Sequence, residues 1–94
     1  MVVGTCMVDL HLPGALSLKD KRSVMKSLIA HLRQAFNVAA AEIDHQDFPQ
    51  SARLGLATIS TDAGHTHAIL ESAVRWIETN RPDVMVVDWE IAIM

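Results

Sequence analysis

Apolar and polar residues alternate along the first segment of the chain, from Val2 to Leu12. A period of two with one apolar side is typical of a strand with one buried face. The residues predicted to face inward are Val2, Gly4, Cys6, Val8, Leu10 and Leu12. Pro13-Gly14 then ends the strand.

The period changes after Ser17. Apolar residues now recur at i, i+3, i+4, i+7 and i+11, which predicts a helix to about Asn37 with one buried stripe. That stripe consists of Met25, Leu28, Ile29, Leu32 and Phe36. Ser17 suits the N-cap, and Asp20 is placed to complete a capping box.

A second helix is predicted from a cap at Thr61 or Asp62 to about Asn80, where Arg81-Pro82-Asp83 ends it. Its inward residues are Thr66, Leu70, Ala73, Val74 and Ile77.

Three more strands are predicted, at Val38–Asp44, Arg53–Ser60 and Val84–Met94. The first is expected to turn Ala39, Ala41 and Ile43 inward, and the second Leu54 and Leu56. The last is expected to turn inward Met85, Val87, Trp89, Ile91 and Ile93.

The resulting order is β-α-β-β-α-β within a single domain, residues 1–94. Right-handed crossovers place both helices on one face of a four-stranded antiparallel sheet whose first and third strands are central. We therefore predict an α+β fold, a ferredoxin-like βαββαβ sandwich with the second sheet face open.

The composition of the chain indicates where in the cell the protein is located. The single cysteine, Cys6, cannot form an internal disulfide, and no apolar run approaches the ~20 residues that span a bilayer. The N-terminus shows no secretory signal. We expect a cytoplasmic protein with no membrane partner.

Charge is unevenly distributed although the net charge is −3. From Ser17 to Phe36 five cations face one carboxylate, a local charge of +4, and the remaining three arginines face ten carboxylates, or −7. Lys19, Arg22, Lys26 and Arg33 fall on one side of the predicted helix, with Lys21 nearby. This stripe is either a solvated face or a site for an anionic partner.

The loop before this helix admits two interpretations as well. A helix N-terminus attracts anions, so Ser17 and the cations that follow could hold a phosphate. Alternatively Ser17 and Asp20 already satisfy the free N–H groups, and the helix is simply capped.

The open sheet face is predicted to be acidic. It would carry Asp9, His11, Glu42, Asp44, Asp88 and Glu90. Aromatic residues are missing from the two central strands, which excludes an RNA-recognition sheet that stacks bases. An interface with a second copy is a plausible use of such a face.

Candidate chemistry is sparse. The acidic residues lack a fixed metal-ligand spacing, and His65 and His67 stand two apart on different sides of a helix. Cys6 points inward as an inert thiol. An acylphosphatase-like arrangement of Arg and Asn around a Gly-rich loop is not found. We predict no catalytic residue, no metal, no cofactor and no enzymatic activity.

Three segments resemble the YlxP-like family of small bacterial proteins, which is classed as a domain of unknown function. They are LPGALSLKDKR from Leu12, AEIDHQD from Ala41 and LGLA from Leu54. The resemblance implies a cytoplasmic bacterial protein with a ferredoxin-like fold and no established activity. It also implies a role near RNA or the ribosome, because members are often encoded beside transcription, translation-initiation and ribosome-maturation factors. The matching positions are Ser17, Lys19, Lys21 and Arg22, and the polar loop Asp44, His45, Gln46 and Asp47.

Two functions remain open. The first is RNA or ribosome association through phosphate contacts from Ser17, Lys19, Lys21, Arg22, Lys26 and Arg33. The alternative is a self-associating, dimeric module that binds a protein or a small metabolite through the open sheet face.

Overall fold

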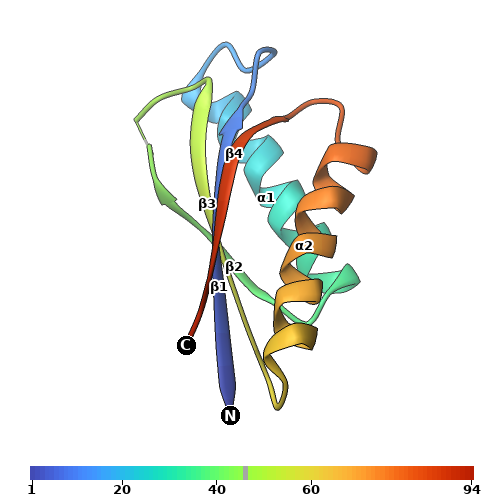
Figure 1. Ribbon diagram of the computed structural model, residues 1–94. Coiled ribbons are helices and arrows are strands. Elements are labelled where there is room, and N and C mark those ends of the chain that lie inside the picture. Colours follow the sequence, from blue (N-terminus) through green and yellow to red (C-terminus); the bar gives the residue numbers. More distant parts are fainter. Residues whose placement is uncertain (46) are drawn as a thin grey trace.

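The computed structural model describes residues 1–45 and 47–94 and has the predicted order of elements. They are β1 (Val2–His11), α1 (Leu18–Ala35), β2 (Ala39–Asp44), β3 (Ser51–Ser60), α2 (Ala63–Asn80) and β4 (Met85–Ile93). The strands form one antiparallel sheet in the order β2-β3-β1-β4, and both helices cover the same face of it (Figure 1). The predicted ferredoxin-like α+β fold is confirmed.

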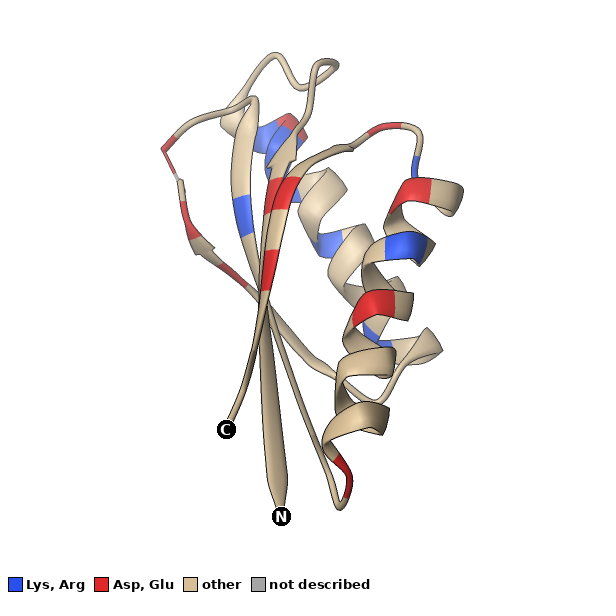
Figure 2. Ribbon diagram, viewed as in Figure 1, with Lys and Arg blue, Asp and Glu red and all other residues tan. Residues whose placement is uncertain are grey.

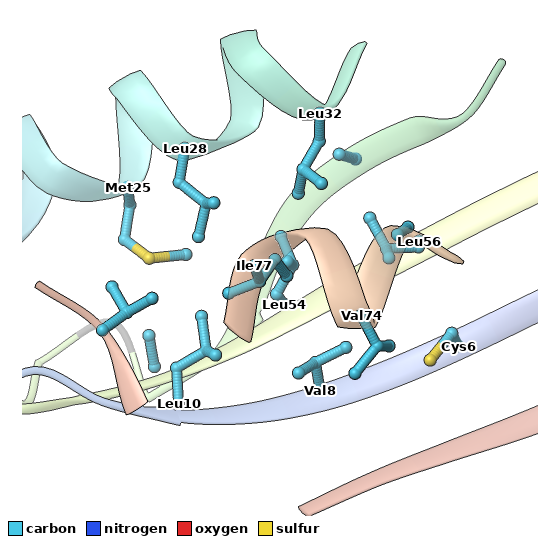
Figure 3. Close-up of a cluster of buried hydrophobic side chains, with 14 of the residues drawn as sticks. Cys6, Val8, Leu10, Met25, Leu28, Leu32, Leu54, Leu56, Val74 and Ile77 are labelled. Atoms are coloured by element: carbon cyan, nitrogen blue, oxygen red, sulfur yellow. The ribbon is translucent and has the colours of Figure 1, made fainter. Parts of the chain in front are cut away.

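The hydrophobic core lies between this sheet face and the two helices. Every second residue of the central strands points toward the helices, and Figure 3 shows Val8 and Leu10 of β1 on the same side as Leu54 and Leu56 of β3. The predicted α2 stripe is buried in full, from Thr66 to Ile77. In α1 the buried positions are Lys21, Met25, Leu28 and Leu32.

Both helices begin at the caps that the sequence indicates. The hydroxyl of Ser17 accepts a hydrogen bond from the Asp20 N–H at 3.1 Å, and the Asp62 carboxylate accepts one from the His65 N–H at 2.7 Å. Asp20 reaches back one residue further than expected, because its carboxylate accepts from the Leu16 N–H at 3.0 Å. These bonds satisfy donors that no helical carbonyl can reach.

The predicted orientation of β2 is wrong. Ala40 is buried, whereas Ala39, Ala41 and Ile43 are exposed on the open sheet face. Glu42 therefore points toward the helices and leaves the open face. Ile43 instead lies over Gly55, with its Cγ2 atom 2.8 Å from where a Cβ atom of that glycine would be. An alanine-rich strand offers little apolar contrast, so other contacts decide its orientation.

The predicted inward face of β4 is correct for its C-terminal half only. Trp89, Ile91 and Ile93 pair with inward-facing residues of β1. The register then shifts between Asp9 and Leu10, and Val86 instead of Met85 packs on the core. Because a bulge adds one residue to one strand, it reverses the side-chain alternation beyond it. Val87 at this position is 64% exposed.

Candidate nucleic-acid interface

Lys21 does not belong to the cationic surface that the sequence predicts. Its side chain is only 1% exposed and its Nζ atom lies 2.9 Å from Oε2 of Glu42. The same ammonium donates hydrogen bonds to the carbonyls of His45 at 2.5 Å and Ser51 at 3.1 Å. A buried cation with three oxygen partners has no surface left for a phosphate. Lys21 is instead part of the core, which corrects the prediction.

This contact joins two of the three segments that carry the family resemblance. Lys21 lies in the Leu12–Arg22 segment, whereas Glu42 and His45 lie in the Ala41–Asp47 segment. Oε2 of Glu42 receives no hydrogen bond from the described residues, and the Lys21 ammonium is the cation that lies next to it. His45 adopts a left-handed backbone with φ of 64°, which is unfavourable for a residue other than glycine.

Four cations of α1 are exposed, and three of them, Lys19, Arg22 and Lys26, make no contact with an oxygen of the described residues. At 3.6 residues per turn they lie within about 60° of one another around the helix. No hydrogen bond or ion pair joins these three side chains to any other described residue. We call Lys19, Arg22 and Lys26 the α1 cationic face. Figure 2 shows Lys and Arg spaced along α1.

Arg33 continues the α1 cationic face but is anchored. Its Nη2 atom donates a hydrogen bond to the carbonyl of Ala40 in β2 at 2.7 Å. The face is therefore on the flank of α1 that borders β2. The opposite flank of α1 contacts α2, where Arg81 lies 3.2 Å from the Ser27 hydroxyl and 3.4 Å from the His31 ring. The cationic flank is thus the one that α2 leaves open.

Ser17 is placed as a cap and not as a phosphate ligand. Its hydroxyl already accepts from the Asp20 N–H, and the Asp20 carboxylate lies at the same helix N-terminus. This carboxylate supplies the negative charge that the helix dipole attracts. We therefore leave Ser17 and Lys21 out of the surface considered below.

The predicted polar loop does not converge on a ligand site. Asp44 lies opposite Arg53 in the sheet register, the ring of His45 packs against Phe48, and Asp47 is exposed. Gln46, also predicted here, lies outside the described residues. Within the described ranges no three His, Cys, Asp or Glu residues are grouped as they would be to hold a metal ion.

The open sheet face is partly neutralised by a residue that the sequence argument overlooked. Arg53 of β3 donates to the carboxylate of Asp9 in β1 at 2.7 Å and 3.4 Å. This hydrogen bond, together with the charge of Arg53, holds the pKa of Asp9 below its usual value. Asp88 pairs with Asp9 in the register and Glu90 with Met7, so Asp88 and Glu90 lie on the same face as Asp9.

On the other face of the sheet, burial raises the pKa of the Cys6 thiol to about 11, as suits an unreactive core residue.

A groove that the sequence did not predict lies at one end of the sheet. The β1–α1 loop and the β2–β3 loop meet there, and both occur at the same end in Figure 1. The groove has a volume of about 400 Å³ and is lined by His11, Ala15, Leu16, Phe48, Pro49, Gln50 and Ser51. Leu16 is 83% and Phe48 59% exposed. A large aromatic residue, Phe48, inside the polar β2–β3 loop was the signal that could have indicated it.

Comparisons with known proteins agree with the resemblance. A family model described as "Protein of unknown function (DUF503)" matches residues 3–91. The uncharacterized protein YlxP of Bacillus subtilis is 33% identical over 63 residues, which are 67% of this chain and 68% of that protein. The de novo designed protein Foldit4 is 10% identical, with a TM-score of 0.53 over 100% of this chain and 97% of the design, and shows the fold alone. Among the described residues no helix is long and apolar enough to cross a membrane.

Proposed function

The chain belongs to the DUF503 family, which includes YlxP-like proteins, and we propose that it is a non-enzymatic RNA-binding protein of the cytoplasm. The α1 cationic face would contact the phosphates of a folded RNA, with ribosomal RNA as the expected class. One observation carries this proposal: Lys19, Arg22 and Lys26 are exposed together and unpaired among the described residues.

Four of the other five basic side chains are bonded within the chain. Lys21, Arg53 and Arg81 each lie within 2.9 Å of a carboxylate, and Arg33 donates to a carbonyl. The fifth, Arg75, is exposed on α2. Carboxylates are more numerous than cations, at 11 against 8, so partners for α1 were available in the sequence. Several acidic residues lie instead on the open sheet face (Asp9, Asp88 and Glu90) and on α2 (Glu71 and Glu78), while Asp20 lies in the first turn of α1 (Figure 2). The α1 cationic face can therefore attract an anionic polymer, while the acidic open sheet face repels it.

Contacts of this kind position a protein on phosphates without reading sequence. Each neutralised phosphate contributes about −0.7 to −0.9 to the slope of log affinity against log salt. Three contacts then give a slope of roughly −2 to −3. Raising the salt from 50 to 200 mM should weaken binding roughly 20- to 40-fold.

The test is RNA affinity measured as a function of salt. We expect the combined variant Lys19→Ala, Arg22→Ala, Lys26→Ala to bind a structured RNA much more weakly and with a flatter salt dependence. Arg22→Ala and Arg75→Ala form a matched pair, because both are exposed helical arginines but only Arg22 lies on the α1 cationic face. A wild-type RNA affinity that does not change with salt concentration would contradict the proposal. So would an unchanged affinity in the triple variant.

Self-association through the open sheet face is a second candidate function. A groove of about 420 Å³ crosses this face, between the exposed side chains of Met7 and Ile43 and over the small residues Ala41, Gly55 and Ala57. Ile59 is 55% exposed further along β3. An apolar sheet half of this kind suits a second copy of the chain, with the acidic half pointing away from the contact.

A further inference from the structure

The groove between Leu16 and Phe48 lies beside the α1 cationic face. Lys21 bonds the carbonyls of His45 and Ser51, which hold the two ends of the β2–β3 loop against the first turn of α1. Arg22 follows Lys21 directly, and Lys19 precedes it by two residues. An RNA strand with its phosphates on this face would therefore pass next to the groove.

The walls of the groove suit a flat aromatic ligand. The chain has only four aromatic residues other than histidine, and Phe48 is placed at 59% exposure instead of in the core. Its ring is contacted nearly edge-on by His45, with centroids 6.0 Å apart and planes 70° apart. Leu16, Ala15 and Pro49 complete an apolar lining. Protein aromatic rings of this kind stack on unpaired bases, whatever the base, because every base has a π-face.

The rim of the groove offers hydrogen-bond acceptors. Nδ1 of His11 lies 3.0 Å from the carbonyl oxygen of Gln50, and since a carbonyl only accepts, Nδ1 carries the hydrogen. Nε2 of the neutral ring is then an acceptor. The side-chain amide of Gln50 donates to the carbonyl of Pro13 at 3.5 Å, which leaves its oxygen as a second acceptor. The edge of every RNA base carries at least one N–H donor to match them.

We propose that the Leu16–Phe48 groove is a subsite for one unstacked nucleobase of the RNA whose phosphates lie on the α1 cationic face. The inference rests on the proposed RNA binding and specifies the substrate as RNA with unpaired bases, such as a hairpin loop or a bulge. Phe48 supplies the stacking surface, and the acceptors of His11 and Gln50 meet the edge of the base.

The experiment compares two RNAs that share one stem, a hairpin with a fluorescent aminopurine in its loop and the same stem as a blunt duplex. Wild-type protein should bind the hairpin more tightly and quench the aminopurine. Phe48→Ala should weaken hairpin binding roughly 5- to 150-fold, the range for loss of one stacked base, and leave duplex binding unchanged. Phe48→Trp should restore both affinity and quenching. Val87→Ala, which trims an exposed apolar residue of β4 outside both proposed surfaces, serves as the matched control.

The outcomes separate the two proposals. If the triple cationic variant loses hairpin binding while Phe48→Ala retains it, the RNA function stands and the base subsite is wrong. Equal losses of hairpin and duplex binding in Phe48→Ala would also overturn the subsite, because a duplex offers no unstacked base. If the wild-type protein binds neither RNA, both proposals fall.

Discussion

The ammonium of Lys21 lies 2.9 Å from Oε2 of Glu42, and this buried ion pair joins the first turn of α1 to the edge strand β2. The same ammonium bonds the carbonyls at both ends of the β2–β3 loop. That loop carries Phe48, so one side chain in the core positions the exposed groove. The buried pair and the proposed RNA surface are thus parts of one arrangement.

Removing Lys21 should be costly. Lys21→Met would leave the Glu42 carboxylate buried without its cation and two carbonyls without donors, and breaking a buried pair in this way costs about 3–5 kcal/mol of unfolding free energy. Lys19→Met changes the same residue type on the exposed side and should stay within about 0.5 kcal/mol of the wild type. Urea unfolding of both variants measures the difference.

The partner of Lys21 offers an internal check. In the combined variant Lys21→Met, Glu42→Leu the uncompensated charge is gone, so part of the lost stability should return. A Lys21→Met protein as stable as the Lys19→Met protein would show that the ion pair contributes nothing to stability.

The elements were predictable from the sequence because their patterns are strong. The α2 stripe from Thr66 to Ile77 repeats at helical period without interruption, and β1 alternates over its whole length. Lys21 was missed although it precedes Met25, Leu28 and Leu32 at the same helical spacing. Lysine is normally exposed, so the prediction placed Lys21 on the surface despite its helical spacing. Its burial depends on the ion pair with Glu42 in β2, which the sequence of α1 does not indicate.

The surface was less predictable than the core. The cations of α1 could be assigned to one face from spacing alone, but which of them are committed to the chain's own oxygens depends on tertiary contacts, as with Arg33 and the carbonyl of Ala40. The groove beside Phe48 requires the β1–α1 and β2–β3 loops to meet, and the contact between Lys21 and Ser51 that holds them together spans 30 residues of sequence. Neither loop has a pattern that indicates the other.

The two glycines of the N-terminal part should respond oppositely to alanine. A Cβ atom on Gly4 would collide with Cγ2 of Thr66 and come within 3.0 Å of Leu70 in α2, so Gly4→Ala should destabilise by about 1–3 kcal/mol. At Gly14 nothing lies within 4 Å and φ is not positive, so Gly14→Ala should be neutral or stabilise by about 0.4–1 kcal/mol. Thermal unfolding compares the pair, and a stable Gly4→Ala variant would contradict the close packing of β1 on α2.

The ion pair at the end of α2 should make stability depend on acid pH. Arg81 donates to the Asp83 carboxylate at 2.7 Å, and this hydrogen bond holds the pKa of Asp83 below its usual value. Because the pKa is lower in the folded chain, the stabilisation is fully present above the unfolded value of about 3.9 and is lost as the pH falls through the folded value.

Stability of Asp83→Asn should therefore fall less than that of the wild type when urea unfolding is repeated from pH 6 toward lower pH. Arg81→Gln removes the partner of Asp83 and should abolish this contribution to the pH dependence. If wild type and Asp83→Asn lose stability in parallel across the acid range, the Arg81–Asp83 pair makes no contribution.

Self-association through the open sheet face should depend on its apolar half. Met7 and Ile43 are 44% and 46% exposed on either side of the groove, so Met7→Lys and Ile43→Lys would place charges inside a contact between two copies. Light scattering over a range of protein concentrations should show a dimer for the wild type and a monomer for both variants. Glu78→Lys, an exposed change on α2, should leave the dimer intact. A wild-type protein that stays monomeric at high concentration would remove this second function and leave the open face as solvated surface.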